Sequence, residues 1–153
     1  MIADIKHFSL MNIADIISVI PLSIYLTLIY IILIRSCENN RNLYIRILIG
    51  LLIATLLSDI IKRIKYPSFM YKITRRPKGA FNTDYLSRNG SVRANAPGFP
   101  SGHMSSTTYF VVMSMLTFAK GFRGNIVGTL LVVLMGWARL YKKCHNLFQV
   151  IGG

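Results

Sequence analysis

Long apolar stretches alternate with short polar segments along this chain. Residues 16–34 form an apolar run without a charged side chain. A helix over this run is about 28 Å long, close to the thickness of the hydrocarbon core of a bilayer. A cleaved signal peptide is the alternative, but the run is longer than a usual signal core and no small-residue cleavage pattern follows it. The pattern therefore predicts a transmembrane helix at 16–34.

Three further apolar stretches predict transmembrane helices at residues 43–62, 104–119 and 124–140. The polar ends of the first of these can snorkel to the interfaces, which extends its short uncharged middle to the length of a span. Residues 145–153 predict only the start of a fifth helix, too short to cross a bilayer. We expect an all-α, multi-pass transmembrane bundle within one domain, 1–153.

The segment between the second and third predicted helices, residues 63–103, is strongly basic. Together with Lys62 it carries nine of the 18 Lys and Arg residues of the chain and only one acidic residue, Asp84. Prolines and glycines interrupt any long helix there. We expect a large loop outside the hydrocarbon, which either attracts anionic lipid headgroups or handles a phosphorylated substrate.

Composition narrows the class of partner. Apolar residues make up 53% of the chain and the formal net charge is +13. Basicity alone would suit nucleic acid, but the apolar runs favour membrane lipids and no nucleic-acid partner is expected. The two cysteines, Cys37 and Cys144, form neither a metal-ligand spacing nor a disulfide framework. We expect no metal and no other cofactor, and a homo-oligomer stays open.

The candidate chemistry centres on Pro-Ser-Gly-His at residues 100–103, directly before an apolar helix. Backbone N–H groups at a helix N-terminus lack partners and carry partial positive charge, and glycine lets an anion come close to them. A histidine there can exchange protons near neutral pH. A helix cap at Ser101 beside a surface histidine is the alternative interpretation. The segment is typical of a phosphate-handling loop.

The order of the predicted helices brings further polar residues to the same side of the membrane. Residues 63–103 and the segment after the fourth helix emerge on one side, which joins Arg76, Ser101, His103, Arg139 and His145 on one face. Phosphoryl transfer needs cations around the phosphate oxygens, a nucleophile in line with the leaving oxygen, and an acid to protonate that oxygen. These residue types supply all three without a metal.

The same residues resemble a known family. Arg76 followed by proline, Pro-Ser-Gly-His at 100–103, and Arg139 separated by five residues from His145 resemble the three signatures of the type 2 phosphatidic acid phosphatase superfamily. These are membrane lipid phosphatases, related to acid phosphatases and vanadium haloperoxidases. The resemblance implies that the chain is a lipid phosphatase and hydrolyses a phosphoric ester or a diphosphate.

The resemblance also implies roles for the two histidines. His145 would attack phosphorus and carry a phosphohistidine intermediate, and His103 would donate a proton to the leaving lipid oxygen. Gln149 stands one helical turn after His145, where the family often has aspartate. A glutamine there can accept from the ring N–H and orient the ring, but it brings no charge.

Phosphate binding is implied for a second group of residues. Arg76, Arg139 and a lysine would hold the phosphate oxygens, with hydrogen bonds from Ser101 and the Gly102 amide. The family lysine usually lies seven residues before the motif arginine, and here that position is a phenylalanine. The helix-end context of Lys62 fits best, Lys65 is the alternative, and Lys72 fits less well. The residue before Arg139 is alanine, where many members have serine.

The segment from His145 to Gln149 resembles dolichyl diphosphatases, which favours a polyprenyl diphosphate over other lipid phosphates. Family members usually have six helices, so we expect that the chain is a fragment, is completed by a partner chain, or is inactive. In the inactive case the basic loop would bind anionic lipid or phosphate without turnover. The positive-inside bias and the basic turns at 35–46 and 120–123 point to opposite orientations, so the side of the membrane stays open.

Overall fold

The fold is described from a computed structural model, which describes residues 2–35, 38–78, 80, 95–118 and 121–153. Helix α1 runs over Ile2–Tyr30 and continues as a π-helical turn over Ile31–Arg35. Helix α2 covers Glu38–Arg63. A 3₁₀ turn at Ser68–Met70 and the short helix α3, Tyr71–Thr74, follow.

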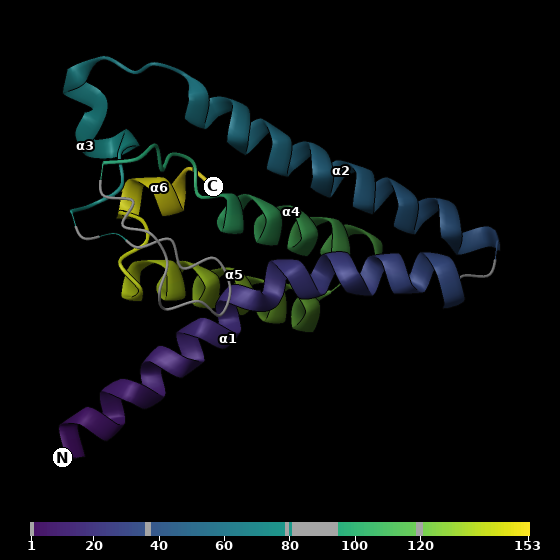
Figure 1. The fold of residues 1–153 in the computed structure, drawn as a ribbon. Helices are drawn as coiled ribbons and strands as arrows, with labels where there is room; N and C mark the ends of the chain where they lie inside the picture. The colour runs from purple at the N-terminus through teal and green to yellow at the C-terminus, as the bar shows by residue number, and fades with distance from the viewer. Residues whose placement is uncertain (1, 36–37, 79, 81–94, 119–120) are drawn as a thin grey trace.

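The second half of the chain adds three helices: α4 at Gly102–Thr117, α5 at Phe122–Tyr141 and α6 at Leu147–Ile151. The second part of α1 and helices α2, α4 and α5 run alongside one another, while the first part of α1 leads away from the bundle to the N-terminus (Figure 1). Pro21 lies inside α1. Because proline supplies no N–H and crowds the preceding turn, it accounts for the bend of α1 in Figure 1.

Among the described residues, three helical segments are long and apolar enough to cross a membrane: Leu10–Ile34, Asn40–Arg63 and Phe122–Tyr141. Helix α4 is not among them because its 16 residues rise only about 24 Å. The described residues contain no strand, only an isolated bridge between Arg75 and Pro97. The all-α membrane fold predicted from the sequence is confirmed.

Two apolar clusters hold the bundle together. One joins α1 and α2 through Ile24, Leu28, Ile47 and Leu51. The other packs α1, α4, α5 and α6 at the opposite end of the bundle; its buried members are Ala14, Ile17, Met104, Met135, Ala138 and Val150. Many Leu, Ile and Val side chains stay exposed on the outer faces of the long helices, as expected for surfaces that contact lipid.

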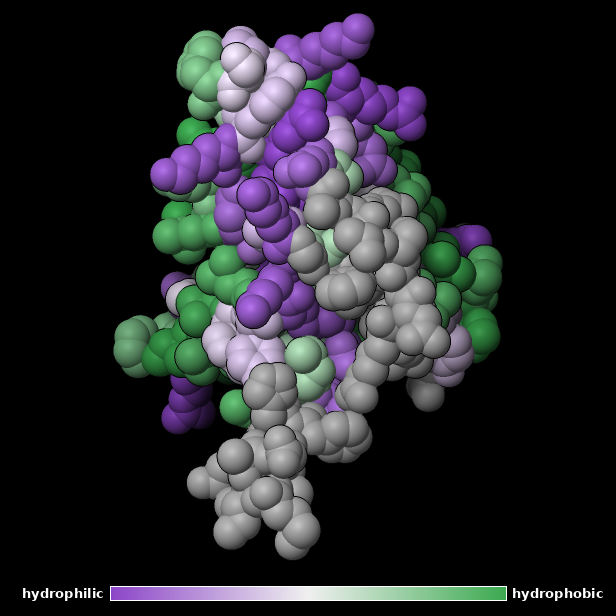
Figure 2. Space-filling model, turned by 60° about the vertical axis from the view of Figure 1, so that its left-hand side comes forward, coloured by the Kyte–Doolittle hydropathy of each residue, from purple (hydrophilic) through white to green (hydrophobic). Residues whose placement is uncertain are grey.

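Glycine permits close helix contact at two points. A Cβ atom on Gly50 of α2 would overlap the Tyr109 ring of α4, and one on Gly128 of α5 would lie 2.8 Å from Val111 Cγ1 and Met115 Sδ. Helices α2, α4 and α5 therefore pack closely. The ends of α2 and α5 lie beside the start of α4. Hydrophilic residues gather at this end of the molecule (Figure 2).

The predicted elements differ from the observed ones at their ends. The first helix begins at Ile2 rather than Ile16, and the last begins at Leu147, capped by Asn146, and covers five residues. The predicted loop 63–103 contains the 3₁₀ turn and α3. Part of its basic stretch, with Arg88 and Arg93, lies outside the described residues, and so does Cys37.

Candidate active site

A cavity of about 340 Å³ lies where α2 ends, α4 begins and α5 ends. Six of the eight predicted site residues line it: Lys62, Arg76, Gly102, His103, Arg139 and His145. The other two, Ser101 and Gln149, are fully buried. The structure therefore brings together side chains that lie far apart in the sequence, among them both histidines.

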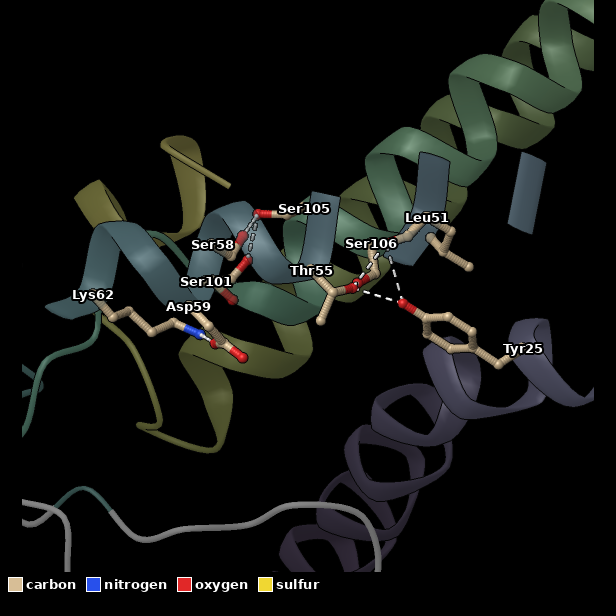
Figure 3. A network of polar contacts seen from close by, with 9 residues as sticks. All are labelled: Tyr25, Leu51, Thr55, Ser58, Asp59, Lys62, Ser101, Ser105 and Ser106. Atoms are coloured by element: carbon tan, nitrogen blue, oxygen red, sulfur yellow. Dashed lines mark hydrogen bonds and ion pairs between the residues drawn. The ribbon is translucent and has the colours of Figure 1, made fainter. Parts of the chain in front are cut away.

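Hydroxyl groups join the end of α2 to the start of α4. Ser58 Oγ donates to Ser105 Oγ at 2.7 Å, and Ser105 Oγ donates to the carbonyl of Ser101 at 3.2 Å (Figure 3). On the same part of α2, Lys62 Nζ lies 2.8 Å from Asp59 Oδ1. A Cβ atom on Gly102 would be 3.3 Å from Lys62 Nζ. The lysine ammonium thus lies directly over the N-terminal turn of α4.

A second network of hydroxyl groups lies at another wall of the cavity. Tyr25 Oη and Thr55 Oγ1 are 2.6 Å apart, and Thr55 Oγ1 is 3.1 Å from Ser106 Oγ (Figure 3). These three residues come from α1, α2 and α4, and all three line the cavity. The network fixes the three helices relative to one another beside the site.

Arg139 is held by an arrangement of charges that the sequence did not reveal. It lies in the last turn of α5 with 1% of its surface exposed, and its Nη1 is 3.4 Å from Ser18 Oγ of α1. Lys142 Nζ also donates to Ser18 Oγ and pairs with Asp15 Oδ1 at 2.7 Å. Helix α1 therefore supplies the groups against which both cations at the end of α5 are positioned.

Gln149 connects His145 to the segment that carries Arg76. Its Oε1 lies 3.0 Å from His145 Nδ1, and its Nε2 donates to the carbonyls of Ile73 at 3.0 Å and Arg75 at 2.7 Å. Two carbonyl acceptors identify Nε2 as the amide nitrogen, so Oε1 must accept a hydrogen bond from the Nδ1–H group. In neutral His145, Nε2 is then the ring nitrogen with a free lone pair.

His145 lies between α5 and α6, outside the candidate spans. Its burial, followed by the charges of Arg139 and Arg76, lowers its pKa to about 3, although the hydrogen bond with Gln149 acts in the opposite direction. The imidazole is therefore neutral at physiological pH, which is the state a nitrogen nucleophile needs.

The segment before α4 fits closely around Arg76 and Gln149. The Arg76 N–H donates to the Ala96 carbonyl at 2.9 Å, and the Gly98 N–H donates to the Thr74 carbonyl at 2.8 Å. A Cβ atom on Gly98 would lie 2.6 Å from Gln149 Oε1 and 2.7 Å from Arg76 Cγ. A larger residue than glycine would collide with both side chains. The backbone at Gly98 therefore packs directly against Arg76 and Gln149 and helps to hold Arg76 near His145.

Ser101 does not act as the helix cap of the alternative interpretation. It occupies the cap position of α4 but makes no side-chain cap hydrogen bond. Its Oγ is buried and has no hydrogen-bond partner among the described residues, while its N–H donates to the Gln149 carbonyl. Ser101 does not line the cavity, so its expected hydrogen bond to phosphate stays a prediction.

The alternative lysines lie elsewhere. Lys65 and Lys72 line two neighbouring pockets and not the cavity that holds both histidines. The cavity contains residues that the sequence analysis missed, namely Pro21, Tyr25, Thr55, Asp59 and Ser106. Asp59 could have been predicted because it lies three residues before Lys62 on the same helix. The other four residues belong to no motif in the sequence. No group of three or more His, Cys, Asp or Glu side chains gathers as a metal site within the described part of the chain.

These features define a helical membrane protein with a cation-lined cavity that is suited to a phosphoryl group. The chain belongs to the PAP2 superfamily, because that family's model matches residues 43–153, more than half of the sequence. No curated protein and no solved structure matches the chain. The match confirms the resemblance to type 2 phosphatidic acid phosphatases, a family of membrane phosphatases that hydrolyse phosphate esters. Helix α1 lies outside the matched residues.

Proposed function

We propose that this protein hydrolyses a lipid phosphate or a polyprenyl diphosphate without a metal, through a phosphohistidine intermediate. The observation that carries the proposal is the common cavity of His103 and His145, which come from different elements and share it with Lys62, Arg76 and Arg139. Two imidazoles and three cations around one space match the needs of an in-line displacement at phosphorus.

In the first step, Nε2 of neutral His145 attacks phosphorus and the bond from phosphorus to the leaving oxygen breaks. The hydrogen bond from Nδ1 to Gln149 leaves Nε2 unprotonated and supports this assignment. His103 gives a proton to the leaving oxygen, which departs as an alcohol or, from a diphosphate, as a lipid monophosphate. A phosphate dianion in the cavity stabilises the imidazolium form of His103 that this transfer uses.

In the second step, water attacks the phosphohistidine. His103, now neutral, accepts a proton from the water and the P–N bond breaks. Inorganic phosphate is released, and His145 returns to its neutral form. Throughout both steps Lys62, Arg76 and Arg139 hold the equatorial oxygens, where the negative charge is spread. The Gly102 amide at the start of α4 adds a backbone donor, and the helix dipole of α4 favours the anion.

The site's position suits a substrate dissolved in the bilayer. Besides α4, the cavity is bounded by α1, α2 and α5, which in the described part of the chain are apolar and long enough to span a membrane. A multi-pass arrangement places the phosphate end of a lipid at this cavity while its chain stays among exposed apolar side chains.

The test is a substrate panel with the purified protein in detergent: phosphatidate, diacylglycerol diphosphate and a polyprenyl diphosphate, each with and without a chelator. We expect chelator-insensitive phosphate release that drops by at least about 10³-fold in His145→Ala and about 10²-fold in His103→Ala. Lys143→Ala, an exposed neighbour, is the matched control and keeps its activity.

Phosphate release that both histidine substitutions leave unchanged would refute the mechanism. Binding of the same lipids without any turnover would instead support the other function, a membrane protein that holds anionic lipid or phosphate. A phosphoryl label that is stable in alkali and lost in acid, and that is absent from His145→Ala, would identify the covalent intermediate.

A further inference from the structure

A second pocket of about 690 Å³ adjoins the catalytic cavity. The two share Asp59 and Lys62, which line both of them. The second pocket is built from the end of α2 and from α3, that is, from the segment that joins Lys62 to Arg76. Three further cations line it, namely Arg63, Lys65 and Arg75.

The charges of this pocket do not cancel. Its lining holds four cations and a single carboxylate, that of Asp59, which pairs with Lys62 at 2.8 Å. Arg63, Lys65 and Arg75 are exposed side chains that surround an open space and that no described carboxylate of the pocket neutralises. Their positive charge favours an anionic ligand.

One of these cations is oriented for binding. The guanidinium carbon of Arg75 lies 3.9 Å above the centre of the Tyr71 ring, and its Nη1 donates to the Asn95 carbonyl at 3.4 Å. Stacking on an aromatic face keeps a guanidinium in one plane, and its five N–H donors suit the oxygens of a phosphate. The Arg75 backbone is fixed as well, because its carbonyl accepts from Gln149 Nε2.

We propose that this pocket, lined by Arg63, Lys65 and Arg75, binds the second phosphoryl group of a diphosphate substrate, the one that stays on the lipid. The inference rests on the proposed function and narrows its substrate class to diphosphates. His145 attacks the terminal phosphorus, the bond from that phosphorus to the bridging oxygen breaks, and the lipid monophosphate leaves with its phosphoryl group in the second pocket. Lys62, which lines both spaces, contacts the bridging region.

The experiment compares a prenyl diphosphate with the prenyl monophosphate of the same chain length in neutral detergent. In the triple variant Arg63→Gln, Lys65→Gln, Arg75→Gln, we expect kcat/KM for the diphosphate to fall by roughly tenfold or more. The monophosphate value stays within about twofold of the parent because that substrate does not reach the second pocket. The matched control removes three exposed cations outside this pocket, with Lys72→Gln, Lys78→Gln and Lys143→Gln, and keeps the parent's preference.

Equal losses of kcat/KM on both substrates, or no loss on either, would overturn the proposal that the second pocket binds a phosphoryl group of the substrate. An anionic lipid headgroup is the other source of phosphate for it, and mixed micelles distinguish the two. If the triple variant loses only its binding to micelles that contain phosphatidylglycerol and keeps its diphosphate preference, the pocket is a headgroup site and the inference is wrong.

A binding measurement separates this inference from the proposed function. If the parent hydrolyses neither substrate, the proposed function fails. Calorimetric measurement of anion binding to His145→Asn then tests whether the second pocket binds a phosphoryl group. Inorganic diphosphate that binds roughly tenfold more tightly than inorganic phosphate, with the difference lost in the triple variant, supports the second pocket. Equal affinities for the two anions overturn it.

Discussion

At the scale of single residues, Gln149 lies behind the cavity and links His145 to the backbone segment before Arg76. Its amide accepts from His145 and Asn146 and donates to two backbone carbonyls beside Arg76. A carboxylate at this position could accept from His145 but could donate to neither carbonyl. The glutamine therefore orients the histidine and also holds the arginine segment, which the family's aspartate could not do in this setting.

We predict that Gln149→Glu lowers kcat/KM by roughly 10–100-fold and changes its pH dependence. In the parent, burial and the arginines lower the pKa of His145 to about 3, so its protonation reduces activity only in strongly acidic solution. A carboxylate next to Nδ1 stabilises the imidazolium and raises this pKa, so the acidic limb of the profile moves to higher pH.

The measurement is the pH profile of kcat/KM for parent, Gln149→Glu and Gln149→Ala. The alanine variant loses activity without the upward shift, because it adds no charge. An unshifted acidic limb in Gln149→Glu would mean that residue 149 supports the fold and does not act through His145.

The sequence predicts the site residues that belong to local motifs, and it does not predict those that reach the site through contacts between helices. His103, Arg139 and His145 belong to local signatures, so their presence in one cavity could be expected from the sequence, and their chemical roles stay predictions. Ser18 and Asp15 of α1 contact Arg139 and Lys142, more than a hundred positions along the chain, and Tyr25 contacts Thr55 of α2, 30 positions away. No local pattern reports such a contact, since it depends on the relative rotation of two helices.

At the scale of elements, α1 is a structural part of the site although it lies outside the family match. Asp15 pairs with Lys142, and Ser18 contacts both Lys142 and Arg139. The Lys142 side chain is only 2% exposed. A buried ammonium without its carboxylate costs several kcal/mol, so this pair couples the position of α1 to the end of α5.

We predict that Asp15→Asn destabilises the protein by roughly 2–4 kcal/mol because it leaves a buried cation without its partner. Lys142→Met in the same chain recovers most of this loss, since an apolar side chain of similar length needs no counter-charge. Thermal unfolding in detergent measures all four members of the double-mutant cycle. Additive losses in the double variant would show that the two residues do not act as a pair.

The elements also show where hydropathy is insufficient. The long apolar runs predicted α1, α2 and α5 as membrane helices, and these are the candidate spans. The start of α1 could not be predicted from apolarity because its first turns carry charged residues, Asp4 and Lys6. Helix α3 was missed because four residues are too few for a periodic pattern.

At the scale of the whole molecule, one end of the bundle gathers the chemistry. The ends of α2 and α5, the start of α4, and α3 and α6 all lie there, while the start of α2 and the end of α4 lie at the other end (Figure 1). The hydrophilic surface in Figure 2 belongs to this same end. A phosphatase site at one end of a membrane bundle requires that Lys72 and Lys143 face the same aqueous side and that Arg123 faces the other.

We predict this sidedness for single cysteines introduced at Lys72, Lys143 and Arg123, all of them exposed, in a background where Cys37 and Cys144 are alanine. Cys144 itself is buried and gives no clear labelling signal. In sealed vesicles a membrane-impermeant maleimide should label positions 72 and 143 from one side and position 123 only from the other, because α5 separates them by about 30 Å of helix. Lysed vesicles provide the control for complete reactivity. Labelling of all three positions from one side would mean that α5 does not cross the bilayer. It would also contradict the interpretation that the exposed apolar face of α5 contacts lipid.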